Sequence, residues 1–119
     1  MSMTDDELLP LHPVAPDVCV APQLTPKAMA EAALRGFKSV INNRPDYEEG
    51  PEQPTNASME AAARAAGMAY VFLPVQGGYQ SPEEIAAFGK LLQEMPRPIL
   101  AFCRSGARST RLYLAATRT

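Results

Sequence analysis

One short segment near the C-terminal end of the chain combines a thiol with basic and small residues. It reads Cys103-Arg104-Ser105-Gly106-Ala107-Arg108-Ser109. The segment follows the apolar run 98–102 and precedes residues 110–116, which are predicted to be helical. Cys103 is therefore expected beside the unpaired backbone N–H groups and the positive dipole end of a helix, which favour a thiolate. This setting predicts a catalytic nucleophile.

The residues that follow Cys103 are suited to hold an anion. Gly106 lets the backbone turn successive N–H groups inward, and the planar guanidinium of Arg108 matches a tetrahedral oxyanion. A serine hydroxyl of the segment would donate a hydrogen bond to the sulfur or to a leaving group. The alternative interpretation is a buried core cysteine beside solvated arginines. We expect the anion-binding loop to comprise, besides Cys103 and Arg108, the residues Arg104, Ser105, Gly106, Ala107 and Ser109.

The other residues with nucleophilic or metal-binding side chains lack such a setting. Cys19 stands between two valines in a predicted strand, which indicates a core residue. His12 lies in a proline-rich stretch, where a catalytic role is not expected. Two cysteines and one histidine are too few for a zinc site. The sequence predicts neither a metal nor a cofactor.

Length and composition predict one domain and exclude some partners. The 119 residues are 46% hydrophobic, enough for a single core. The net charge is −2, and the sequence shows no basic face with interleaved aromatic residues. Nucleic acid is therefore not an expected partner. The N-terminus is acidic where a secretory signal is basic, and no apolar run is long enough to cross a bilayer. We expect a cytoplasmic protein with no membrane partner and reduced thiols.

The predicted elements alternate between strand and helix. Residues 1–17 are expected to form an extended N-terminal tail because of their prolines, and residues 18–119 a single catalytic domain. The alternation predicts an α/β fold, in which a mostly parallel four-stranded sheet carries helices on both faces and binds ligands beyond the carboxyl ends of its strands. The predicted strands are 18–20, 37–42, 69–73 and 98–102, and the predicted helices are 25–36, 58–66, 81–94 and 110–116.

Three motifs together resemble a known bacterial family. They are the Cys103 loop with the segments Pro22-Gln23-Leu24-Thr25 and Val40-Ile41-Asn42-Asn43-Arg44-Pro45-Asp46. From Val18 onward the chain is similar to the phosphatase-like domain that occurs alone or at the N-terminus of beta-lactamase hydrolase-like proteins. The resemblance implies a fold similar to that of dual-specificity tyrosine phosphatases, with the four strands in the order first, fourth, second, third.

The resemblance implies two activities, between which the loop length helps to choose. The fold implies phosphatase-like hydrolysis, whereas the loop and the family's occurrence beside persulfide-oxidising domains imply rhodanese-like sulfur transfer. Tyrosine phosphatases place five residues between cysteine and arginine and a histidine before the cysteine. Here four residues separate Cys103 from Arg108, and Phe102 precedes. The shorter loop is similar to that of rhodaneses.

The source of a proton also separates the two activities. Cleavage of a phosphate ester by a thiolate usually needs an acid at the departing oxygen. Segment 74–79 has no aspartate where tyrosine phosphatases keep theirs. Asp46, Glu48 or Glu49 would have to substitute, although the stretch around Asp46 also fits a structural turn. Sulfur transfer has an anionic leaving group and needs no strong acid, so the sequence favours it.

Three hypotheses follow. The first is a sulfurtransferase that moves a sulfane sulfur from thiosulfate or a persulfide through a Cys103 persulfide to a thiol acceptor, with a persulfide-oxidising protein as a possible partner. The second is a phosphatase that hydrolyses a phosphate ester through a phosphocysteine, with Arg108 on the phosphoryl oxygens and Asp46 as a candidate acid. The third is a module that binds an anion or a persulfide without turnover. The sequence leaves the oligomeric state open.

Overall fold

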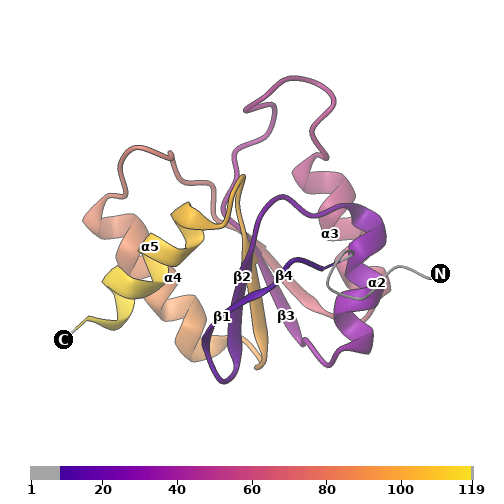
Figure 1. The fold of residues 1–119 in the computed structure, drawn as a ribbon, viewed down its shortest axis with the longest axis horizontal. Helices are drawn as coiled ribbons and strands as arrows, with labels where there is room; N and C mark the ends of the chain where they lie inside the picture. Colours follow the sequence, from indigo (N-terminus) through magenta and orange to yellow (C-terminus); the bar gives the residue numbers. More distant parts are fainter. Residues whose placement is uncertain (1–8, 119) are drawn as a thin grey trace.

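The computed structural model describes residues 9–118, and residues 1–8 of the predicted tail lie outside this range. Strands and helices alternate along most of the described chain (Figure 1). The strands are β1 (His12–Ala15), β2 (Val18–Ala21), β3 (Ser39–Asn42), β4 (Ala69–Phe72) and β5 (Ile99–Phe102). The helices are α2 (Pro26–Leu34), α3 (Asn56–Ala65), α4 (Pro82–Glu94) and α5 (Ala107–Thr117).

The sheet is mixed and has five strands in the order β1-β2-β5-β3-β4. The prediction of a four-stranded sheet in the order 1-4-2-3 is therefore wrong for the sheet as a whole, because β1 adds an antiparallel strand at one edge. The other four strands pair in parallel and lie in the order β2-β5-β3-β4. β3 and β5 are buried along their whole length, as the apolar run at 98–102 predicted.

The second half of the predicted tail belongs to this sheet. His12 pairs with Val20 and Pro13 with Cys19, across the turn at residues 16–17. An edge strand tolerates Pro13 because one side of its backbone donates no ladder hydrogen bond. The prediction of a tail is therefore wrong for residues 12–15, which form an edge strand that accommodates proline.

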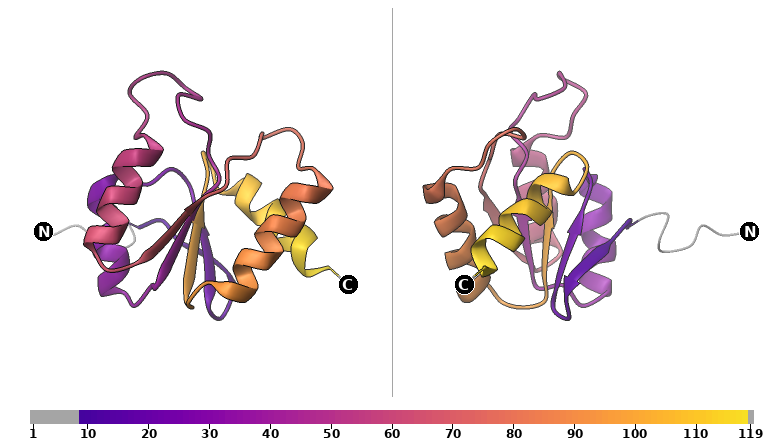
Figure 2. Two further views of the ribbon diagram at one scale, coloured as in Figure 1. Left: turned by 180° about the vertical axis from the view of Figure 1, so that it is seen from behind. Right: turned by 60° about the vertical axis from the view of Figure 1, so that its left-hand side comes forward.

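Helices cover both faces of the sheet, as predicted (Figures 1 and 2). α2 and α3 pack together on one face over a cluster that includes Met29, Met59 and Phe102. α4 and α5 pack on the other face around Phe88 and Leu112. No helix within residues 9–118 combines the length and the apolar character that a membrane crossing requires.

Side-chain and backbone caps fix where the helices begin. The Ser81 hydroxyl accepts from Glu84 N–H, and the Glu84 carboxylate accepts from Ser81 N–H, as in a capping box. Thr25 caps α2 in the way that its sequence predicted. α5 begins at Ala107 and not at Thr110, because Gly106 at the N-cap takes a left-handed backbone with φ +93°. The helix therefore reaches closer to Cys103 than we expected.

The parallel strands bring distant segments to one edge of the sheet. The loop 43–55 follows β3, the loop 73–81 follows β4, and the Cys103 loop follows β5, and all three lie at the carboxyl ends of their strands (Figure 1). Asn43 N–H donates to Phe102 O at 2.8 Å, and Val75 N–H donates to Asn43 O at 3.0 Å. Backbone hydrogen bonds thus tie the loop after β3 to the end of β5 and to the loop after β4.

The packing of α5 gives a direct test of the fold. Leu112 is 0% exposed and Leu114 is 54% exposed on the same helix. We expect Leu112→Ala to lower the free energy of unfolding by about 2–5 kcal/mol, because it removes buried methyl groups and leaves a cavity. The matched variant Leu114→Ala should cost less than about 1 kcal/mol. Urea denaturation measures both, and equal losses would contradict the assigned face of α5.

Candidate active site

Cys103 lies at the junction between β5 and the first turn of α5. Its N–H donates to Ala21 O at 3.3 Å, which holds the residue against the end of β2. The N–H of Gly106 donates to Cys103 Sγ at 3.1 Å. The residue is only 1% exposed. A backbone donor aimed at the sulfur stabilises negative charge there, which a purely apolar packing position would not do.

Cys19 provides the contrast. It lies in the interior of β2 and packs against the core on the face of α2 and α3. Burial raises the pKa of the Cys19 thiol. The two free cysteines of the described chain therefore differ in setting, and Cys19 is partly buried against the core next to its flanking valines.

Arg108 lies in the first turn of α5 with its side chain turned into the protein. It is 7% exposed. One guanidinium nitrogen, Nη1, donates to Val75 O at 3.0 Å, and Nη2 lies 3.1 Å from a Glu48 carboxylate oxygen. A Cβ added to Gly77 would lie 3.2 Å from Nη2, so the glycine backbone permits this close approach. Arg108 therefore connects the helix to both neighbouring loops.

Glu48 joins Arg108 to a second buried arginine, Arg44. The Nε of Arg44 donates to Glu48 Oε1 at 2.9 Å, and its Nη1 donates to Gln23 Oε1 at 3.0 Å. Burial of Glu48 acts to raise its pKa, but the hydrogen bonds and charges of Arg108 and Arg44 outweigh it and leave the pKa below its ordinary value. Glu48 is therefore an anion held between two guanidiniums.

Arg104 lies on the exposed side of the Cys103 loop. Its Nη2 lies 2.8 Å from Glu49 Oε2, and its backbone carbonyl accepts from Gln23 N–H at 3.1 Å. Both side chains are about half exposed, so this ion pair contributes little to stability. It nevertheless brings a second carboxylate of the loop 43–55 to the loop of Cys103.

The two serines that were expected to donate a hydrogen bond to the sulfur or to a leaving group have other partners. Ser109 is fully buried and donates to Asn43 Oδ1 at 2.8 Å. Ser105 Oγ accepts from Ala107 N–H at 3.3 Å. Because α5 starts early, Ala107 and Ser109 belong to its first turn and not to a loop, and helical geometry turns the Ser109 side chain into the core.

Asp46 is brought to the start of α3. Its Oδ1 accepts a hydrogen bond from Asn56 N–H at 2.7 Å, next to the Thr55 cap. This contact gives Asp46 a structural role at the start of α3, and its role as an acid stays a prediction. Its carboxylate thereby satisfies an unpaired donor of the first helical turn.

Sequence reasoning missed the bridging role of Glu48 and the central position of Asn43. Asn43 accepts from Ser109 and donates its side-chain N–H to Leu73 O at 3.0 Å, so it ties α5 to the exit of β4. The available signal was the polar run Asn42-Asn43-Arg44, which begins at the last residue of the buried strand β3. Polar residues at the carboxyl end of a parallel strand mark the ligand-binding edge.

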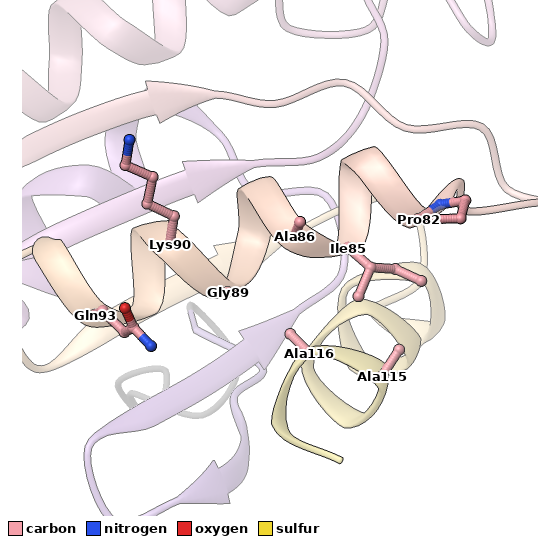
Figure 3. Close-up of a pocket in the computed structure, with 8 residues that line it drawn as sticks. All are labelled: Pro82, Ile85, Ala86, Gly89, Lys90, Gln93, Ala115 and Ala116. Carbon is pink, nitrogen blue, oxygen red and sulfur yellow. The ribbon is translucent and has the colours of Figure 1, made fainter. Parts of the chain in front are cut away.

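A second surface feature lies away from this edge. A groove of about 510 Å³ runs between α4 and α5 (Figure 3). Lys90 is the one charged side chain among its lining residues, and no cysteine, serine or carboxylate lines it. Within residues 9–118, no three side chains of the metal-ligating types are grouped to hold a metal ion. The Cys103 edge therefore remains the candidate active site.

The chain presents a cysteine loop between a central strand and a helix N-terminus of an α/β fold, and comparison with known proteins places it among the phosphatase-like enzymes. More particularly, the chain belongs to the family described as the beta-lactamase hydrolase-like protein, phosphatase-like domain, whose pattern matches residues 10–118. This membership confirms the resemblance found in the sequence. It supports the phosphatase alternative better than sulfur transfer, which no comparison shows.

Individual relatives agree with this assignment. A beta-lactamase hydrolase-like protein from Agrobacterium fabrum is 46% identical over 82 residues, which are 69% of this chain and 19% of that protein. A crystal structure labelled as a phosphatase from Neisseria meningitidis has 29% identity and a TM-score of 0.79, covering 89% of this chain and 72% of that one. The active form of Tk-PTP has 17% identity and a TM-score of 0.60, covering 89% and 79%, and shares the fold.

The position of Glu48 between two arginines predicts a pH-dependent stability. We expect Glu48→Gln to lower the free energy of unfolding at neutral pH by about 1–3 kcal/mol, because two buried guanidiniums lose their counter-charge. The folded pKa of Glu48 is lowered, so its contribution is present above the ordinary value of 4.5 and is lost as the pH falls through the folded value. The difference between variant and wild type should therefore shrink in acid.

Urea denaturation from neutral pH down to about pH 3 measures this difference. The matched control is Glu52→Gln, an exposed carboxylate of the same loop, which should stay within about 0.5 kcal/mol of wild type. A difference for Glu48→Gln that is constant over the whole pH range would contradict the ion-pair assignment.

Proposed function

We propose that this chain is a cysteine-dependent phosphatase that acts on a small phosphate ester. The observation that carries the proposal is a buried hydrogen-bond donor of Arg108 that has no acceptor. Its Nε is buried, and nothing within residues 9–118 accepts a hydrogen bond from it. A buried charged donor without an acceptor costs free energy, and an anionic oxygen is the acceptor that best offsets this cost. A guanidinium fork beside a nucleophilic cysteine suits a phosphoryl group.

The proposed reaction uses Cys103 as the nucleophile. Its thiolate attacks phosphorus, the bond to the leaving oxygen breaks, and a phosphocysteine forms. Arg108 and the N–H groups of the first turn of α5 hold the phosphoryl oxygens as their charge develops. Water then attacks phosphorus, releases phosphate and regenerates the thiolate. Arg104 contributes positive potential at the entrance, and Gly106 provides the backbone geometry that aims its N–H at sulfur.

The role of Cys103 is tested by hydrolysis of an aryl phosphate. We expect Cys103→Ser to lower turnover of p-nitrophenyl phosphate by about a thousandfold or more, because the hydroxyl is a far weaker nucleophile. The matched control is Cys19→Ser, which changes the other free cysteine and should keep turnover near the wild-type value. Retained turnover in Cys103→Ser would overturn the proposal.

Sulfur transfer is the second candidate, and the spacing of the loop favours it. Four residues separate Cys103 from Arg108, as in rhodanese-like loops. Cys103 would attack the outer sulfur of thiosulfate, sulfite would leave as an anion, and the persulfide would pass to a thiol acceptor or to a persulfide-oxidising protein. A binding module without turnover is the remaining alternative.

Intact mass after brief incubation with thiosulfate tests this second candidate. Sulfur transfer predicts the gain of one sulfur atom on wild type and on Cys19→Ser but not on Cys103→Ser, and its removal by a reducing thiol. An unchanged mass, together with turnover of the aryl phosphate, would exclude sulfur transfer as the activity.

A further inference from the structure

The carboxylates that face the Cys103 loop are engaged as hydrogen-bond acceptors. Glu48 lies between Arg44 and Arg108, at 2.9 and 3.1 Å. Glu49 lies 2.8 Å from Arg104. The hydrogen bonds and charges of Arg108 and Arg44 leave the pKa of Glu48 below its ordinary value, although burial acts to raise it. Glu48 is therefore poorly suited to give a proton to a leaving group, and Glu49 already serves as the partner of Arg104.

The other carboxylates of the loop 43–55 are Asp46 and Glu52. Asp46 accepts the Asn56 N–H at 2.7 Å, so its Oδ1 is occupied at the start of α3. Glu52 is exposed and lies beyond the bend at Gly50, whose φ is +103°. The loop that approaches Cys103 thus supplies negative charge and hydrogen-bond acceptors.

The loop 73–81 meets the same site through its backbone. Val75 O accepts from Arg108 at 3.0 Å, and Gly77 O accepts from Arg111 at 2.7 Å. The residues from Leu73 to Ser81 include no carboxylic acid. This loop therefore fixes two arginines of α5 through its backbone carbonyl oxygens, and its Tyr79 side chain is exposed.

From these contacts we propose a leaving-group requirement, which rests on the proposed phosphatase function. The site acts on substrates whose leaving group departs as a stable anion: phosphoanhydrides, acyl phosphates and acidic aryl phosphates. Ordinary alkyl phosphate esters, whose alkoxide must be protonated as it leaves, react poorly. The substrates are restricted in this way because Glu48 and Glu49 orient arginines and Asp46 caps a helix, so none of the three protonates the leaving group.

Each step of this reaction balances without a protein acid. Cys103 Sγ donates an electron pair to phosphorus, and the bond between phosphorus and the leaving oxygen breaks with its pair on that oxygen. The leaving group departs as phosphate, carboxylate or phenolate and takes any proton later from solvent. Water then forms a new bond to phosphorus, the S–P bond returns its pair to sulfur, and the proton of water passes to phosphate or solvent.

The test is the dependence of kcat/KM on the acidity of the leaving phenol, measured from dinitrophenyl to unsubstituted phenyl phosphate. Because negative charge develops on the leaving oxygen, kcat/KM should fall roughly tenfold for each unit by which the phenol pKa rises. The same slope is expected in Asp46→Asn, Glu48→Gln, Glu49→Gln, Glu52→Gln and Tyr79→Phe. The slope is a ratio of rates, so a loss of folded protein in a variant does not change it.

The possible outcomes separate this inference from the function on which it rests. A wild-type slope that is nearly flat, while Cys103→Ser is inactive, would overturn the leaving-group requirement and leave the phosphatase in place. A variant with a markedly steeper slope than wild type would also overturn it and identify the acid. Failure of the wild type to hydrolyse even dinitrophenyl phosphate would overturn the phosphatase itself.

Discussion

The arrangement of the site depends on one carboxylate shared by two buried guanidiniums. Arg44 and Arg108 come from segments far apart in the sequence, and both donate to Glu48. Two buried cations near each other repel, and each is costly to bury without a partner. Glu48 offsets both effects, so it holds the loop after β3 against the first turn of α5. Arg108 takes its orientation from this pairing.

The polypeptide backbone sets the rest of the geometry. Gly106 adopts φ +93°, which starts α5 immediately after the Cys103 loop and aims an N–H at the sulfur. Gly77 lets the neighbouring loop lie close to Arg108. These two glycines and the shared carboxylate bring the N-terminal end of α5 and Cys103 together at the carboxyl edge of the sheet.

The sequence was sufficient for the helices, the parallel strands and the position of Cys103 between β5 and α5, because periodicity, caps and the loop motif are local signals. It was insufficient for β1, since prolines in residues 10–16 suit an edge strand and a tail equally well. The bridge from Arg44 through Glu48 to Arg108 was also out of reach, because it depends on how loops meet across the sheet. Loop length suggested sulfur transfer, whereas the family and the fold favour a phosphatase.

The central claim is that Cys103 carries the phosphoryl group. The most direct measurement is intact mass and peptide mapping after mixing the protein with dinitrophenyl phosphate and quenching in acid within the first turnover. The account predicts one added phosphoryl group, located on the peptide that contains Cys103 and absent from Cys103→Ser. Release of the phenol with no phosphoryl group on the protein, or with the group on another residue, would contradict it.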